Sequence, residues 1–226
     1  MDIKQEKSLS MQDITISSFT EEDLNSFIEI HIENLFSDSE FSNIYLAERF
    51  KYLLLNEDAV TVSAKNNAGE MLGLVYGGPE GYKNNMNKHI MKKIVWSLLR
   101  KPYLLFGREF IYKYKSALNR LTLKLKPSST KNQVIMNSSK TQYSPPSPIL
   151  RLTGIAVLEE FLHLGIGEKL LIGYEIAAKE RNYKSIILET PDTNIRAIKF
   201  YEKFGWKNYV SENANMGKVY FYKLIS

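Results

Sequence analysis

The sequence contains no cysteine among its 226 residues. A chain without cysteine forms neither a disulfide framework nor a cysteine-ligated metal site, and it has no thiol nucleophile. The absence fits a cytoplasmic location, where disulfides are rare.

Long apolar runs are absent as well. No stretch approaches the roughly 18 apolar residues that a membrane span needs, and the polar start of the chain carries charges of both signs, unlike a secretory signal. With 44% hydrophobic and 24% charged residues, the composition is ordinary for a globular protein with a sizeable core. We therefore expect a soluble or at most peripheral protein, built as one large domain or as a domain with an insertion.

Motifs for metal and nucleophile chemistry are also missing. The chain has three histidines and no H-E-x-x-H, clustered acids or other ligand set, so we expect no metal. It has no G-x-S-x-G and no P-loop, which removes the usual signatures of serine hydrolases and of P-loop nucleotide-binding proteins.

Acidic residues are nearly absent from 83–131. This stretch holds 13 Lys or Arg and a single acid, Glu109, which gives it a charge of +12 within a chain of net charge +5. The charges can be the solvated face of a helical subdomain, a lid that attracts an anionic acceptor, or a peripheral membrane contact, because aromatic residues lie between them. No nucleic-acid motif accompanies them, so we expect no nucleic acid partner.

The periodicity of apolar residues predicts an alternation of strands and helices. Strands are predicted at 14–19, 59–65, 70–78, 149–157, 185–190 and 218–225. Helices are predicted at 24–36, 41–55, 87–100, from Pro102 onward, 165–181 and 193–205. A long polar loop is predicted at 126–148. Strand–helix–strand–helix order with apolar strands predicts an α/β fold with parallel pairing in the C-terminal half.

The same patterns divide the chain into four parts. We expect a loose terminus at 1–11, an N-terminal part at 12–82, a basic helical insertion with its loop at 83–148, and a C-terminal core at 149–226.

The chemistry is concentrated where the predicted strand 149–157 ends and Gly165-Ile166-Gly167 opens a helix. The first amide N–H groups of a helix lack intrahelical partners, and the helix dipole adds positive potential there. Glycines allow positive φ and let a ligand approach the backbone. Together these features predict a cradle for a pyrophosphate, in which a side chain at Gly167 would block the ligand.

A second motif follows at the right distance. In DTNIRAIKFYEKFGW (192–206), Asn194, Ala197 and Tyr201 lie along one predicted helix. With IAV…GIGEKLL, this segment resembles the acetyl-CoA-binding core of the GNAT acetyltransferase superfamily, whose pattern R/Q-x-x-G-x-G/A precedes N-x-x-A-x-x-x-Y-x-x-x-G-F. The resemblance covers about residues 149–225. A looser one, over most of the chain, is to members found in surface-polysaccharide biosynthesis.

The resemblance implies the GNAT fold: a mixed central sheet flanked by helices, here with the basic helical insertion before the fourth strand. It implies acetyl-CoA as co-substrate, with the pantetheine arm between strands four and five. The residues expected to contact it are Ile155, Ala156, Val157, Leu162, His163, Leu164, Gly165, Ile166, Gly167, Glu168, Asn194 and Ala197. Leu162 replaces the Arg or Gln of the family pattern, so phosphate binding is expected from backbone amides.

Three residues are candidates for catalysis. The resemblance implies that Tyr201 protonates the departing CoA thiolate; as an alternative it is a core aromatic at helical spacing. For the general base, Glu189 and His31 are candidates. Glu189 can instead be a structural partner of a nearby Lys or Arg, and His31 a satisfied, half-buried histidine.

The function that this implies is transfer of acetyl from acetyl-CoA to a primary amine, with an amino sugar on a nucleotide carrier as the first acceptor to consider. The alternative is a non-catalytic CoA-binding or membrane-associated module. The oligomeric state is left open.

Overall fold

The computed structural model describes residues 14–35, 40–100, 143–211 and 215–225. The predicted loose terminus at 1–11, the predicted helix from Pro102 onward and most of the predicted loop at 126–148 lie outside these ranges.

A mixed sheet of seven strands forms the centre of the described structure, in the order β1-β2-β3-β4-β5-β7-β6. The strands are β1 (Thr15–Ser17), β2 (Val60–Lys65), β3 (Met71–Pro79), β4 (Ile149–Val157), β5 (Ser185–Pro191), β6 (Lys207–Tyr209) and β7 (Lys218–Leu224). Neighbours are antiparallel except β4 and β5, which confirms the predicted parallel pairing. The sequence did not predict β6, because Lys207–Tyr209 shows no alternation of apolar and polar residues.

Five helices are described, with two short 3-10 turns, η2 (Glu21–Asp23) and η4 (Glu159–Phe161). The helices are α1 (Leu24–Leu35), α2 (Glu40–Leu55), α3 (Tyr82–Arg100), α5 (Ile166–Glu180) and α6 (Ile195–Lys203). Helix α3 begins five residues before the predicted Asn87, because its buried stripe starts with Tyr82 and Met86 and then repeats every turn. The boundary predicted at residue 83 therefore falls inside this helix.

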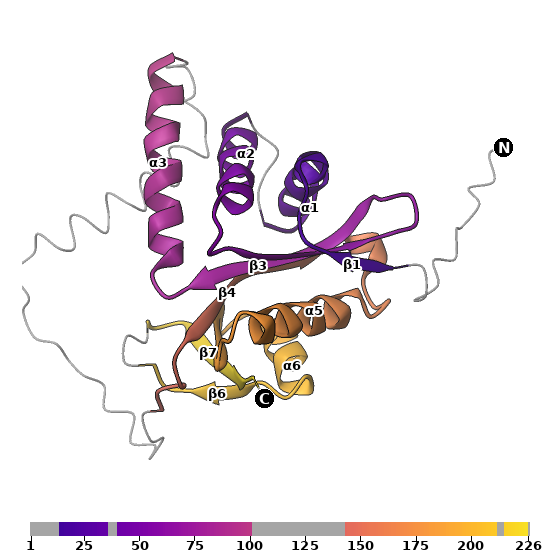
Figure 1. Ribbon diagram of the computed structural model, residues 1–226, viewed down its shortest axis with the longest axis vertical. Coiled ribbons are helices and arrows are strands. Elements are labelled where there is room, and N and C mark those ends of the chain that lie inside the picture. The colour runs from indigo at the N-terminus through magenta and orange to yellow at the C-terminus, as the bar shows by residue number, and fades with distance from the viewer. Residues whose placement is uncertain (1–13, 36–39, 101–142, 212–214, 226) are drawn as a thin grey trace, which may run out of the picture.

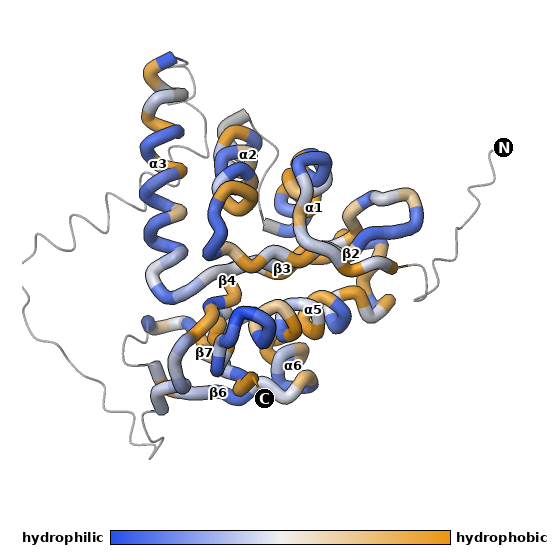
Figure 2. Tube along the Cα trace, viewed as in Figure 1, coloured by the Kyte–Doolittle hydropathy of each residue, from blue (hydrophilic) through white to orange (hydrophobic). Residues whose placement is uncertain are grey.

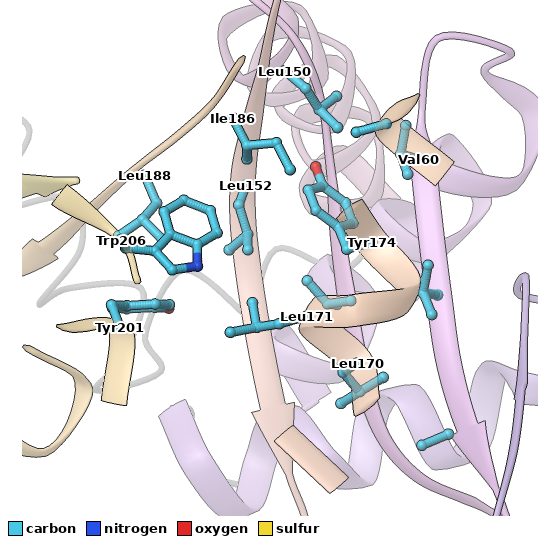
Figure 3. Packing of buried hydrophobic residues seen from close by; sticks show 14 of the residues in the cluster. Val60, Leu150, Leu152, Leu170, Leu171, Tyr174, Ile186, Leu188, Tyr201 and Trp206 are labelled. Carbon is cyan, nitrogen blue, oxygen red and sulfur yellow. The ribbon is translucent and has the colours of Figure 1, made fainter. Parts of the chain in front are cut away.

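The helices cover the two faces of the sheet unequally (Figure 1). Helices α1, α2 and α3 lie on one face, over the β1–β4 side, and α5 and α6 lie on the other. Each face has its own apolar core; Leu170, Leu171 and Tyr174 of α5 pack near Leu150 and Leu152 of β4 (Figure 3). The face of β5, β7 and β6 that points toward the α3 side carries no described helix.

Apolar residues follow the strands, whereas α3 alternates between apolar and hydrophilic positions along its length (Figure 2). Its far end extends beyond α1 and α2 (Figure 1). The described helices include none that is both long and apolar enough to cross a membrane.

Candidate active site

The candidate site lies where β4 and β5 separate. The two strands pair at Ile149–Ser185, Leu150–Ile186 and Arg151–Ile187, and both continue well beyond these pairs. No described strand pairs with β4 beyond Arg151 on this side. The separation that the resemblance implies for strands four and five is therefore present.

A β-bulge at Thr153 changes the face to which β4 side chains point. Tyr76 pairs with Gly154 and Gly77 with Leu152, so Thr153 is the extra residue. Before the bulge Leu150 and Leu152 belong to the α5-side core; after it Ala156 belongs to the α1-side core. Gly77 is required here, because a Cβ would lie 1.9 Å from the Arg151 carbonyl oxygen.

The backbone of Ile155 to Val157 continues the antiparallel ladder with β3, which ends with the Leu158 amide donating to the Leu72 carbonyl at 3.0 Å. Along an antiparallel strand, residues that hydrogen-bond to the partner strand alternate with residues whose backbone groups point away from it. Ala156 is therefore bonded to β3, whereas the backbone groups of Ile155 and Val157 point toward the opening. The Val157 carbonyl already accepts a hydrogen bond from the Asn34 side chain at 3.2 Å.

The loop after β4 is held in place at its start. The Glu159 amide donates to the Glu33 carboxylate at 2.8 Å, and the Leu162 amide donates to the Glu159 carbonyl at 3.1 Å. His163 and Gly165 then adopt positive φ, 71° and 76°, which turns the chain into α5.

Six consecutive amides follow without partners. None of the backbone N–H groups of residues 163–168 donates to a group in the described part of the chain. They surround the N-terminus of the 15-residue helix α5, where the dipole favours an anion. This loop, residues 163–168, is called the amide loop below.

Gly167 packs closely against α6. A Cβ on Gly167 would lie 3.1 Å from Cζ of Phe200 on α6, so a side chain here would meet the packing between the two helices. The glycine that turns the amide loop is Gly165. Ile166 is buried in the core, while Leu164 is 37% exposed.

Two further predicted contact residues form a helix cap. Asn194 precedes α6, and its side-chain oxygen accepts a hydrogen bond from the Ala197 amide at 3.1 Å. This cap fixes the start of α6. It also occupies the Ala197 amide and thereby orients the helix that carries Tyr201.

Tyr201 is 5% exposed and packs among aromatic rings. Its ring centroid lies 5.7 Å from those of Trp206 and Phe221. In Figure 3 its hydroxyl end points toward β4. Burial raises the pKa of the Tyr201 phenol, so the proton stays on the hydroxyl at neutral pH.

Glu189, on β5, is bonded to two lysines through the same oxygen. Its Oε1 accepts from Nζ of Lys83 at 3.1 Å and from Nζ of Lys218 at 2.7 Å. Burial acts to raise the pKa of Glu189, but the two ammonium groups outweigh it and lower the pKa. A carboxylate held this way is a weak base, which favours the alternative of a structural partner.

His31 is buried within the α1-side core, 1% exposed. Its Nδ1 lies 2.8 Å from the Phe27 carbonyl oxygen and its Nε2 lies 3.1 Å from the Tyr76 hydroxyl. Burial, with the nearby Arg49 charge, lowers the pKa of His31 to about 3. A neutral imidazole with both nitrogens occupied favours the satisfied-histidine alternative.

A pocket of about 750 Å³ lies over the face of β4, β5, β7 and β6 that no described helix covers. We call it the sheet pocket. It is lined by Glu80, Gly81, Lys83, Asn84, Tyr143, Ser144, Pro145, Ile149, Arg151, Ile187, Glu189, Tyr209, Ser211, Asn215 and Tyr220. Apart from Glu189, the sequence did not single out these residues, although the alternation along 149–157 sets Arg151 opposite Leu150 and Leu152. Within the described ranges, no group of three or more His, Asp or Glu is placed to hold a metal ion.

Comparison with known proteins identifies the fold. Residues 135–206 match the Acetyltransferase (GNAT) family, a segment that includes β4, the amide loop, α5, β5 and α6. No protein of curated function is similar enough in sequence to be matched.

Solved structures of low sequence identity share the architecture. A GNAT-family acetyltransferase from Staphylococcus aureus superposes with a TM-score of 0.52 at 16% identity, covering 94% of this chain and 99% of that one. The PaiA N-acetyltransferase from Thermoplasma acidophilum, solved with coenzyme A, gives 0.53 at 14% identity, covering 93% and 98%. The ribosomal-protein-S18-alanine N-acetyltransferase from Escherichia coli gives 0.50 at 16%, covering 94% of each chain. The chain has the GNAT fold.

Proposed function

From a GNAT fold that carries a GNAT-family domain over residues 135–206, we propose that this protein transfers acetyl from acetyl-CoA to a primary amine. The observation that carries the proposal is the position of the amide loop. Six N–H groups that have no partner in the described part of the chain lie at the start of α5, which follows β4, the strand that separates from β5.

The described residues fit acetyl-CoA. The amide loop offers donors and dipole potential to the pyrophosphate without an arginine or glutamine side chain. The outward backbone groups of Ile155 and Val157 offer partners to the pantetheine amides. An N–H directed at the thioester oxygen stabilises the charge that develops there, an effect of about 10²–10³ in rate for oxyanion-type donors.

Tyr201 is the proposed proton donor. The amine attacks the thioester carbon, the C–S bond breaks, and the Tyr201 hydroxyl gives its proton to the departing thiolate. The amine must lose a proton before attack. Glu189 is paired with two lysines and His31 is enclosed. We therefore assign the deprotonation of the amine to water, or to the fraction of the acceptor that is already neutral in solution.

An amino sugar on a nucleotide carrier is the proposed acceptor, and the cytoplasm the proposed location. The support for the acceptor is the sheet pocket, which combines cationic and tyrosine side chains on the face opposite α5 and α6. The rival function is a non-catalytic CoA-binding module.

Release of free CoA decides between these functions. The purified protein, incubated with acetyl-CoA and a panel of amines that includes nucleotide-linked amino sugars, should release thiol in proportion to the acetylated amine seen by mass spectrometry. Because the chain has no cysteine, a thiol reagent reports CoA alone. Binding of acetyl-CoA without thiol release above the amine-free rate, with every amine, would support the non-catalytic alternative.

Helix α3 favours the membrane interpretation of the basic segment. It carries no acid, and Met91, Val95, Trp96 and Leu99 are between 49% and 76% exposed beside its basic residues. Lys92 lies nine residues past Lys83, about 14 Å along the axis, which exceeds the screening length of about 8–10 Å. A charge there acts weakly on the sheet pocket.

We therefore expect the triple variant Lys92→Gln, Lys93→Gln, Arg100→Gln to lose sedimentation with vesicles of anionic lipid, while the acceptor KM stays within about twofold. Neutral vesicles serve as the control. A raised KM with unchanged sedimentation would restore the acceptor-lid interpretation. A change in neither would leave the charges as a solvated face.

A further inference from the structure

Two cationic residues, Lys83 and Arg151, line the sheet pocket together with two acids, Glu80 and Glu189. Lys83 and Lys218 share one carboxylate oxygen of Glu189, so two positive charges face one negative charge. Each ammonium has three donors, and the side chains of Lys83 and Lys218 remain 43% and 35% exposed. Both lysines therefore keep donors for another acceptor. Glu80, the other acid that lines the pocket, is exposed to solvent.

Arg151 adds a second, independent positive charge. It lies on β4 at the last residue pair before β5 departs, half-buried, and lines the pocket. Among the described residues, its guanidinium has neither an ion-pair nor a hydrogen-bond partner. Its charge acts on Tyr209, where it opposes the burial that raises the pKa of that phenol. A half-buried guanidinium that faces an open pocket without a protein partner has donors available for an anion.

Another hollow near the site has the opposite charge. Glu29, Glu33, Glu159 and Glu160 line a space of about 500 Å³ beside the start of the loop after β4. Carboxylates there repel anions. An anionic part of the acceptor is therefore directed to the sheet pocket.

Resting on the proposed function, we infer that the sheet pocket binds a phosphate or carboxylate group of the acceptor, with Arg151 as its specificity-determining contact and Lys83 beside it. Guanidinium binds both groups through paired hydrogen bonds. Tyr143, Tyr209 and Tyr220 line the same pocket and give it aromatic surface beside these cations. The acceptor class is thus a primary amine that carries an anionic group.

Three matched amines test the inference: glucosamine, glucosamine 6-phosphate and glucosaminuronic acid (2-amino-2-deoxyglucuronic acid). Their dissociation constants are measured by calorimetry on the full chain saturated with CoA, which prevents turnover. The parent should bind the phosphate or the carboxylate amine at least tenfold more tightly than glucosamine, and the preferred one identifies the anion. Arg151→Gln should remove the preference and leave glucosamine binding unchanged.

Two variants serve as controls. Arg151→Lys keeps the charge but loses the fork, so it should retain part of the preference; Lys92→Gln, on the exposed part of α3, should retain all of it. A parent without preference, or a preference that survives in folded Arg151→Gln, would overturn the inference. Thiol release is measured separately. If thiol is released with all three amines but the parent shows no preference for an anionic amine, only this inference is overturned. If the parent keeps the preference but releases no thiol, only the catalytic proposal is overturned.

Discussion

Replacing Tyr201 with phenylalanine should lower kcat by about 10- to 1,000-fold and leave the melting temperature unchanged. The change removes only the hydroxyl, which forms no hydrogen bond to another described residue. Ring packing against Trp206 and Phe221 is kept. Because burial raises the pKa of the Tyr201 phenol, the parent should keep this proton donor through pH 9. The loss corresponds to removal of a general acid.

Single-turnover kinetics with saturating acetyl-CoA and acceptor check this prediction, because they isolate the chemical step from product release. Tyr183→Phe serves as the matched control, since Tyr183 lies on the turn after α5 and packs only at the edge of the core. An unchanged single-turnover rate in Tyr201→Phe would make Tyr201 a packing residue and assign the proton to water.

Gly165→Val should weaken acetyl-CoA binding by tenfold or more, about 1.4 kcal/mol per decade. Gly165 has φ of 76° at the start of α5, a conformation that costs a residue with a Cβ roughly 1–2 kcal/mol and a β-branched residue more. Relief of that strain rotates the peptide planes of the amide loop and separates donors that must converge on one pyrophosphate.

Calorimetry with acetyl-CoA measures the loss. Gly69→Val is the matched control: Gly69 has φ of 83°, its Cβ would meet open space, and it lies in the β2–β3 turn. Both variants should lose comparable stability, but only Gly165→Val should lose affinity. A folded Gly165→Val with parental affinity would remove the amide loop as the binding site.

The sequence predicted those parts whose determinants are close together in the chain. Strand β4 was predicted with its bounds, and α5 and α6 to within two residues at each end, because their apolar periods are complete and glycines or caps mark their ends. The sequence pointed to both Gly165 and Gly167. Only the structure shows that Gly165 turns the backbone, whereas Gly167 leaves room for the Phe200 ring.

The rest depended on contacts between distant residues. Lys83 and Lys218 are 106 and 29 residues from Glu189, so its role as their shared partner is invisible in the local pattern. The enclosure of His31 depends on Tyr76, 45 residues away. The sheet pocket is formed by strands β4 to β7, by the start of α3 and by residues 143–145. None of these segments by itself carries a sequence pattern that predicts a pocket.

The short pairing of β4 with β5 also divides the sheet along the chain. Every described strand before β4 lies on one side of this seam and every described strand after it on the other, and α5 connects β4 to β5. Three residue pairs are the whole backbone ladder across the seam, although the α5-side core and the Lys83–Glu189 pair also span it, so the ladder opens more readily there than within either block. Native-state hydrogen exchange should therefore resolve two cooperative units in the free protein. A ligand that fills the seam and bonds to both blocks should merge the two cooperative units into one. Binding would then change the cooperativity of unfolding as well as its midpoint.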